Sequence, residues 1–440
     1  MFRILCRDEK EKARLLEVAR LFGPADLFDI RFGEDFEADM VLLSPDSDEN
    51  RAALWRVLRD ATGKEPDWGI LTGVRPAKLY RLLGDEAEEV LRRRFLVSEP
   101  KIGLLRDVCS VQDGMAFDRS PQAIGVYVGI PFCPTRCSYC SFASNPFSEE
   151  GSKEYLRALF YEISRIGSII NRNAMYAESV YIGGGTPTSL SEGDFEKLME
   201  AVSSTFVSER TREFSVEAGR PDTITPAKLR AIRGYGAGRV SVNPQSMKQR
   251  TLDLIGRSHR TEEIYSAYEM VREAGIPCVN MDLIAGLPEE SPDDFADTLG
   301  KVIALDPENI TVHTLAVKRA SRLIEEDAEY SYRSAETVRA MLSGCGETMR
   351  EAGYRPYYVY RQKQMAGNLE NTGWSKPGFE SLYNVRIMEE DQTILACGAG
   401  AISKRVGADG KIVRAANVTN YRIYIDRIDE MIERKENLLR

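Results

Sequence analysis

The stretch IGVYVGIPFCPTRCSYCSF, residues 124–142, joins a short apolar run to three closely spaced cysteines. The apolar run predicts a β-strand, and the loop after it carries Cys133, Cys137 and Cys140 in a C-x3-C-x2-C spacing. Thiolates are the ligands of iron–sulfur clusters, and three of them on one tight loop leave one iron of a [4Fe-4S] cube open. An open iron can chelate the amino and carboxylate groups of S-adenosylmethionine (SAM). The loop therefore predicts a [4Fe-4S] site.

Two other kinds of site use similar spacings. A structural zinc ion takes four ligands, but the nearest cysteines beyond the loop are Cys109 and Cys278, and the chain has only two histidines, His259 and His313. A Cys-x-x-Cys redox pair would leave the third cysteine of the loop unused and lacks a thioredoxin-like context. The cluster fits the spacing better than either alternative.

Composition limits the possible classes of protein. The chain has 440 residues, 43% of them hydrophobic, and a formal net charge of −9, which together predict a folded protein of two or three domains that does not bind nucleic acid non-specifically. The first residues, MFRILCRDEKEKARLL, lack the apolar core of a signal peptide. No apolar run is long enough for a membrane span. We therefore expect a soluble, cytoplasmic protein.

The pattern along the chain predicts an α/β protein in four parts. Residues 1–108 form a small α+β domain and residues 109–123 a polar linker. In residues 124–317, six strand-like runs alternate with five amphipathic helices, which predicts a parallel sheet with helices outside. Six units are fewer than a full barrel needs, so we expect a partial (β/α)6 barrel. Residues 318–440 are predicted to be an α+β extension that packs on its open side and covers the substrate.

The cysteine loop, with an aromatic residue (Tyr139) before its last cysteine, resembles that of radical SAM enzymes. The resemblance continues through YIGGGTPTSL, FSVEAGRPDTIT, RVSVNPQS, LIGRSHR and MDLIAGLP, and is strongest to the oxygen-independent coproporphyrinogen III oxidases. GVRPAKL near the N-terminus and YRQKQMAGNLENTGW near the C-terminus indicate the HemZ branch. Two positions depart from many relatives, since Gly129 stands in place of a histidine and Phe142 in place of a further cysteine.

The resemblance implies a set of residues that contact SAM, among them Glu217 and Gln245 at the ends of predicted strands and Asp282 within one. It assigns a Gly-rich turn to the amino group of SAM, and one arginine to its carboxylate. The implied contacts are Tyr127, Gly184, Gly185, Thr186, Glu217, Gln245, Arg257 and Asp282. Each residue also has a plain structural alternative, such as a tight turn for the glycines, a cap for Gln245, a surface ion pair for Arg257 or a core position for Tyr127.

The resemblance also implies a reaction. The reduced cluster would split SAM into methionine and a 5′-deoxyadenosyl radical, which would remove a hydrogen from the β-carbon of a propionate of coproporphyrinogen III. Loss of CO2 then leaves a vinyl group, and two such events give protoporphyrinogen IX in anaerobic haem synthesis. An electron donor of the flavodoxin or ferredoxin type and an unidentified electron acceptor would be needed. Two other interpretations stay open, namely a different radical SAM reaction on a tetrapyrrole, such as haem modification or ring opening, and a non-catalytic haem chaperone.

A tetra-anionic macrocycle needs cationic partners. Lys318, Arg319 and Arg322, after the last barrel strand, are the candidates, followed by Arg361 and Lys363. A run of tyrosines could flank the flat ring: Tyr354, Tyr357, Tyr358 and Tyr360. The alternative is that these charges are solvated and these rings are core.

Overall fold

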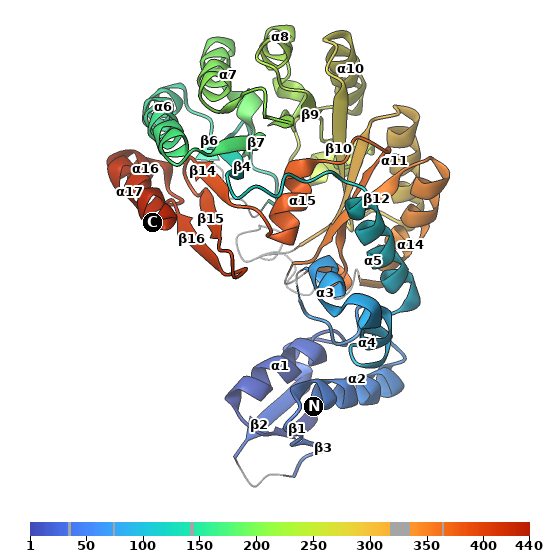
Figure 1. Cartoon of the computed structure of the whole chain (residues 1–440). Helices are drawn as coiled ribbons and strands as arrows, with labels where there is room; N and C mark the ends of the chain where they lie inside the picture. Colours follow the sequence, from blue (N-terminus) through green and yellow to red (C-terminus); the bar gives the residue numbers. More distant parts are fainter. Residues whose placement is uncertain (34–36, 74, 141–144, 317–334, 363–364) are drawn as a thin grey trace.

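The computed structural model describes residues 1–33, 37–73, 75–140, 145–316, 335–362 and 365–440 (Figure 1). The N-terminal part begins with a parallel sheet in the order β2-β1-β3. Two helices share its core, because Leu15 and Val18 of one and Leu54 and Leu58 of the other are buried with Ile4. These elements are β1 (Phe2–Cys6), α1 (Glu9–Ala19), β2 (Phe28–Phe32), β3 (Met40–Leu42) and α2 (Ser47–Thr62).

Three further helices form a second small core, which includes Val359 from the far end of the chain. They are α3 (Pro76–Leu83), α4 (Ala87–Arg93) and α5 (Glu99–Asp113). The predicted linker 109–123 was wrong at its start, because residues 109–113 are the last turn of α5. Cys109 and Gln112 are buried there, and the Gln112 amide donates a hydrogen bond to the Tyr357 carbonyl at 2.9 Å. Because the Gln112 amide has a hydrogen-bond partner inside the protein, this polar residue can lie on a buried helix face, which the sequence alone did not indicate. The other predicted domain boundaries stay predictions.

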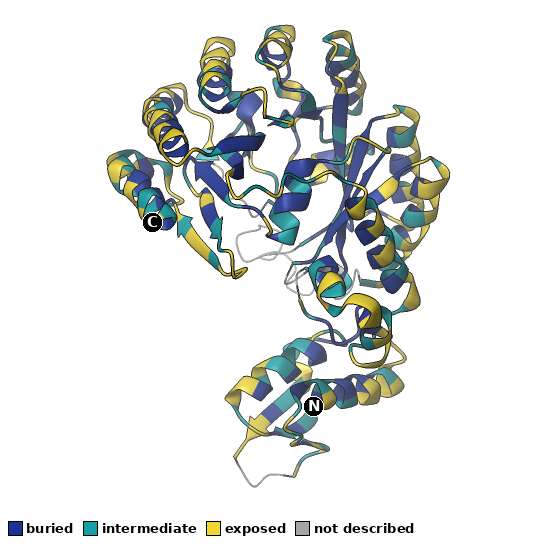
Figure 2. Ribbon diagram, viewed as in Figure 1, coloured by how far each residue is buried: buried dark blue, intermediate teal, exposed yellow. Residues whose placement is uncertain are grey.

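Six parallel strands with helices outside form the centre of the molecule (Figure 1). The strands are almost continuously buried, as parallel strands covered on both faces must be (Figure 2). The strands are β4 (Ala123–Ile130), β7 (Tyr176–Gly184), β8 (Glu213–Glu217), β9 (Arg239–Ser241), β10 (Cys278–Ala285) and β11 (Asn309–Thr314). The helices are α6 (Glu149–Arg172), α7 (Glu192–Phe206), α8 (Pro226–Gly234), α9 (Gln249–Leu254), α10 (Thr261–Glu273) and α11 (Pro292–Ala304). The sheet does not close, which confirms the predicted partial barrel.

The C-terminal extension adds strands to both edges of this sheet. The full order is β12-β13-β11-β10-β9-β8-β7-β4-β14-β15-β16, with β14 parallel to β4. The added strands are β12 (Arg355–Tyr360), β13 (Asn371–Ser375), β14 (Ile394–Cys397), β15 (Ile402–Val406) and β16 (Ile412–Ala416). The helices are α14 (Ala335–Glu351), α15 (Leu382–Glu389), α16 (Tyr421–Asp426) and α17 (Ile428–Leu439). The extension is thus part of the sheet as well as a cover, and no helix in the described ranges is both long and apolar enough to cross a bilayer.

A buried ion pair fastens the last helix to the barrel. Lys435 of α17 donates to Glu162 of α6 at 2.7 Å, and both side chains are fully buried. Glu162 also accepts hydrogen bonds from the Tyr424 hydroxyl at 2.6 Å and the Gly398 N–H at 2.7 Å. The carboxylate is therefore surrounded by donors from three C-terminal segments.

We expect Lys435→Met to lower the free energy of unfolding by about 3–5 kcal/mol, because it leaves a buried carboxylate without its counter-ion. Lys301→Met is the matched control, since Lys301 pairs with Asp297 at 2.6 Å on the surface and its loss should cost at most about 1 kcal/mol. Urea titrations of the wild type and both variants measure the two losses. Similar losses in the two variants would contradict the prediction.

Candidate active site

A cavity of about 410 Å3 lies at the carboxyl ends of the parallel strands. Its lining includes every residue that the sequence predicted for the cluster and for SAM: Tyr127, Cys133, Cys137, Cys140, Gly184, Gly185, Thr186, Glu217, Gln245, Arg257 and Asp282. These residues come from separate loops and from strands β4, β7, β8 and β10. The fold thus brings the predicted site residues together, while their individual roles stay predictions.

Backbone hydrogen bonds hold the cysteine loop at the rim of this cavity. The short strands β5 (Phe132–Cys133) and β6 (Asn145–Pro146) pair with each other, and the Ser138 N–H donates to the Ile255 carbonyl at 3.0 Å. Of the eight cysteines, the three of the loop are partly exposed, while the other five are buried. Three accessible thiols on one fixed loop are the donor set that an iron–sulfur cluster requires.

A glycine lets the turn after β7 lie against the first cysteine. A Cβ on Gly185 would lie 2.5 Å from the Phe132 carbonyl oxygen and 2.9 Å from the Cys133 Sγ. The Thr186 hydroxyl contacts the same sulfur at 3.6 Å. In the described part of the chain, no three His, Cys, Asp or Glu side chains are arranged around a single metal ion. A cube differs from such a site, because each thiolate binds its own iron.

Glu217, the last residue of β8, lines the cavity and is fixed there by two hydrogen bonds. Its carboxylate accepts hydrogen bonds from the Tyr181 hydroxyl at 2.7 Å and the Gly184 N–H at 3.1 Å. Burial raises the pKa of Glu217 to about 7, and the nearby Asp282 carboxylate acts in the same direction. Glu217 therefore changes protonation in the neutral pH range.

Arg257 and Gln245 present unused polar groups to the cavity. The Arg257 guanidinium donates to the carbonyls of Gly219 and Asn243 at 3.1 and 3.0 Å and to the Tyr139 hydroxyl at 3.3 Å. Within the described ranges it has no ion pair with a carboxylate, so its charge is available to an anionic ligand. The buried Gln245 side-chain oxygen has no hydrogen-bond partner among the described residues. It could therefore accept a hydrogen bond from a ligand hydroxyl.

Asp282 belongs to a row of polar side chains on β10 and β11. It lies 3.6 Å from His313 Nε2, and the Asn280 amide donates to it at 2.7 Å. Although burial alone would raise the pKa of Asp282, the hydrogen bond from His313 lowers it. His313, Asn280 and Thr311 line the cavity but were not predicted as contacts. The sequence does contain a signal for them, because polar residues alternate with apolar residues along these strands, which places the polar side chains on one face of the sheet.

The predicted substrate contacts have mixed outcomes. Lys318, Arg319, Arg322 and Lys363 lie outside the described residues. Arg361 points away from the cavity, because it is buried, donates to the Asn368 carbonyl at 3.0 Å and lies over the Trp68 ring at 4.9 Å. The tyrosines have different surroundings. Tyr354 and Tyr357 are core residues, whereas Tyr358, which is also buried, and Tyr360 line the cavity.

Comparison with known proteins shows the family. Residues 127–302 match the radical SAM superfamily. The oxygen-independent coproporphyrinogen-III oxidase-like protein HemZ of Bacillus subtilis (strain 168) is 39% identical over 391 residues, covering 86% of this chain and 78% of HemZ. The chain belongs to the radical SAM superfamily. The match also confirms the predicted HemZ branch, and [4Fe-4S] and SAM are the cofactors of this superfamily.

Two further relatives of this radical SAM protein have different names. The heme chaperone HemW of Bacillus subtilis (strain 168) is 31% identical over 310 residues, covering 69% of this chain and 76% of HemW. The solved structure of coproporphyrinogen III oxidase (HemN) from Escherichia coli has a TM-score of 0.57 at 24% identity, covering 74% of this chain and 73% of HemN. The structural match supports the same fold.

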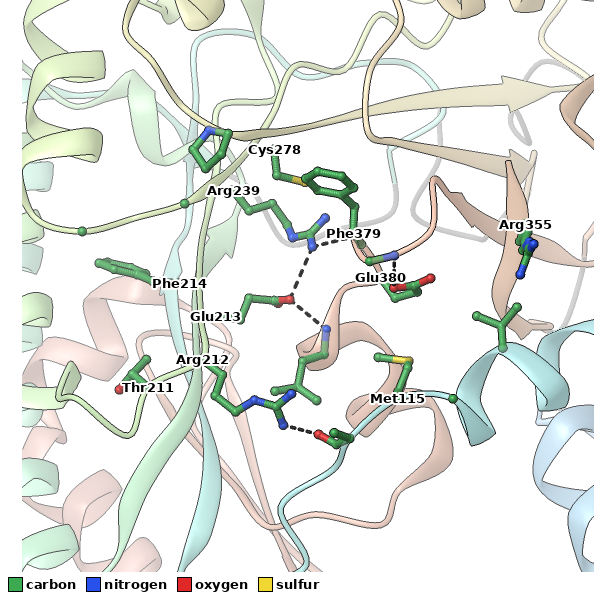
Figure 3. Close-up of a pocket in the computed structure, with 18 of the residues that line it drawn as sticks. Met115, Thr211, Arg212, Glu213, Phe214, Arg239, Cys278, Arg355, Phe379 and Glu380 are labelled. Carbon is green, nitrogen blue, oxygen red and sulfur yellow. Dashed lines mark hydrogen bonds and ion pairs between the residues drawn. The ribbon is translucent and has the colours of Figure 1, made fainter. Parts of the chain in front are cut away.

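A second hollow of about 700 Å3 lies at the opposite, amino ends of β8 and β9 of the radical SAM barrel (Figure 3). Figure 3 shows Glu213 and Arg239 pointing toward each other, 3.6 Å apart. The Glu213 carboxylate also accepts the Leu382 N–H at 2.7 Å, so it caps α15. The polar groups of this hollow thus hold the helix inside the barrel.

The pH dependence of stability should reveal Glu217. Its folded pKa of about 7 lies above its ordinary value of 4.5, so the folded protein binds more protons here between these pH values and loses stability as the pH rises through them. From pH 5 to pH 8 we expect the wild type to lose about 2 kcal/mol more than Glu217→Gln. Urea titrations at both pH values test this, and equal losses would contradict it.

Proposed function

We propose that this protein converts propionate side chains of coproporphyrinogen III to vinyl groups by oxidative decarboxylation, giving protoporphyrinogen IX. One observation carries the proposal: a single cavity is lined by the three partly exposed cysteines of the loop, by Arg257 and by the Gln245 side-chain oxygen, which has no hydrogen-bond partner among the described residues. The 39% identity to HemZ, whose name describes it as coproporphyrinogen-III oxidase-like, supports the choice of substrate. The electron donor and acceptor stay predictions.

The residues of the cavity suit the two cofactors. Cys133, Cys137 and Cys140 would hold the cluster, and the cluster with SAM would supply the radical chemistry that starts the reaction. Arg257 would bind the SAM carboxylate, since its guanidinium is oriented by two carbonyls and has no described counter-ion. Glu217, once ionised, would accept a hydrogen bond from an ammonium group.

Further residues would bind the sugar and the macrocycle. The unpaired Gln245 oxygen and the Asp282 carboxylate can accept hydrogen bonds from ribose hydroxyls. Tyr358 and Tyr360 stack with ring centroids 6.3 Å apart on the cavity wall. Together with Met388 of α15 they offer apolar surface to a flat ring.

Gly185→Ala should prevent normal cluster uptake. The added methyl group would overlap the Phe132 carbonyl and the Cys133 sulfur, so the loop must shift away from the turn. We expect most of the iron and sulfide to be lost after anaerobic reconstitution, measured by chemical analysis and visible absorbance. Gly193→Ala is the control, because a Cβ there meets nothing within 4 Å. Full cluster content in Gly185→Ala would count against this site.

The reaction itself is tested by anaerobic incubation of the reconstituted protein with SAM, a strong reductant and coproporphyrinogen III. We expect 5′-deoxyadenosine and vinyl products to form together, and neither to form with Cys137→Ala, which lacks one proposed ligand. Chromatography with mass spectrometry measures both. 5′-Deoxyadenosine without vinyl products would refute this reaction and indicate another substrate.

A haem chaperone is the second candidate function, and two observations favour it. HemW is 31% identical to this chain, and His313 places an imidazole, a common axial ligand of haem iron, in the cavity wall. Haem binding that disappears in His313→Gln, without turnover of SAM, would support this function over decarboxylation.

A further inference from the structure

A cluster of cations lies on the open side of the barrel, where the two sheet edges approach each other. Helix α3 packs against β12 at one edge, and the β15–β16 hairpin extends the other edge. In Figure 1 both lie near the end of α15. Residues from α3, α15 and the hairpin meet at this point, which we call the seam, made up of Arg75, Lys78, Glu390, Lys404 and Arg414.

Glu390, the residue after α15, is the centre of the seam. Its nearly buried carboxylate pairs with Arg414 at 2.5 Å, Arg75 at 3.1 Å and Lys78 at 3.9 Å. Lys404 lies beneath and contacts the carbonyls of Arg386 and Ile387 at the end of α15 at 3.4 and 3.3 Å. One carboxylate thus joins both edges of the open barrel.

The seam has a surplus of positive charge. Arg75, Lys78 and Arg414 share Glu390, and Lys404 lies close enough to feel its charge. The neighbouring Asp391 is already engaged by Arg386 at 2.9 Å. Burial is the main cause that lowers the pKa of Lys404 to about 8, and Arg75 and Arg414 add to it, while Glu390 and Asp391 oppose it. Arg75, Lys78 and Arg414 are 32%, 37% and 50% exposed, so a ligand can reach them.

The seam lies at the end of α15, the helix that also forms part of the wall of the active-site cavity. Asn384 and Met388 of α15 line that cavity, and Glu390 follows two residues later. A volume of about 410 Å3 is at the lower end of the range for small-molecule sites, and the residues matched to SAM occupy much of its lining. A tetrapyrrole bound beside SAM must therefore project beyond the cavity.

We propose that Arg75, Lys78 and Arg414 bind propionate carboxylates of the tetrapyrrole where it projects through the open side of the barrel. The proposal rests on the proposed function for its ligand, a polycarboxylate macrocycle. It gives a role to GVRPAKL, in which Pro76 starts α3 and places Arg75 before and Lys78 within its first turn. Cations from both edges of the sheet would then bind one anionic substrate. When the substrate is absent, their ion pairs with Glu390 keep them in position.

Lys78→Gln and Arg414→Gln test the two edges separately. The probe is coproporphyrin III, the stable fluorescent macrocycle with four carboxylates, titrated onto the reconstituted protein with SAM present. We expect each variant to weaken its binding about threefold to tenfold, and to leave binding of the uncharged tetramethyl ester and of SAM unchanged. Lys301→Gln and Arg93→Gln, exposed ion-paired residues on α11 and α4, are the matched controls.

Wild-type affinity for coproporphyrin III in both variants would overturn the proposal, as would equal losses in the controls or for the ester. Its failure is distinguishable from that of the proposed reaction. If the wild type forms vinyl products and both variants keep its KM, the seam is not a substrate site. If binding depends on the seam but no vinyl product forms, the seam stands and the decarboxylation is refuted.

Discussion

An open sheet of parallel strands leaves an apolar inner face and the backbone groups of two edge strands exposed unless other segments pack against them. In this protein α15 packs against the inner face. The Glu213 carboxylate accepts the Leu382 N–H and so fixes the start of this helix. One residue later, the Tyr383 ring stacks on Tyr181 with centroids 4.6 Å apart. Because Met388 of the same helix lines the cavity, the segment that completes the core also forms a wall of the site.

The cavity that results has acids in two different electrostatic environments. Burial raises the pKa of Glu217 to about 7, whereas the hydrogen bond from His313 helps to lower the pKa of Asp282 despite its burial. Arg257 adds a cation whose described partners are carbonyl and hydroxyl oxygens. A zwitterionic ligand with an ammonium and a carboxylate would satisfy both Glu217 and Arg257 at once, and its ammonium group would draw Glu217 toward the ionised state.

The sequence was sufficient to predict those features of the fold and the site that are determined by residues close together in the chain. The cysteine spacing and the alternation of strands and helices lie within short windows, so the loop and the partial barrel could be predicted. The glycines next to the loop could be located, but the reason for Gly185, contact with the Cys133 sulfur, is visible only in three dimensions. The motifs likewise identified the residues that line the cavity, since several of them, such as Gly184 and Glu217, stand at strand ends that a parallel sheet places along one rim.

The failures involve partners that are distant in the chain. Arg361 looked like a free cation beside a substrate, but its partner ring, Trp68, is almost three hundred residues away. Gln112 made the end of α5 look like a linker, because its hydrogen bond goes to Tyr357. A polar residue is predicted from sequence to be exposed unless its buried hydrogen-bond or ion-pair partner is known.

These same long-range contacts show how the N-terminal helices relate to the site. The Trp68 indole donates to Glu370 at 2.8 Å, and Glu370 directly precedes β13, where Asn371 lines the cavity. Arg75 of the next segment reaches Glu390 at the end of α15. The segment from Trp68 to Arg75, which leads into α3, is therefore anchored to both cavity walls that the C-terminal extension supplies. Removing it would leave the buried Glu370 without its indole donor, so this segment is a structural component of the site.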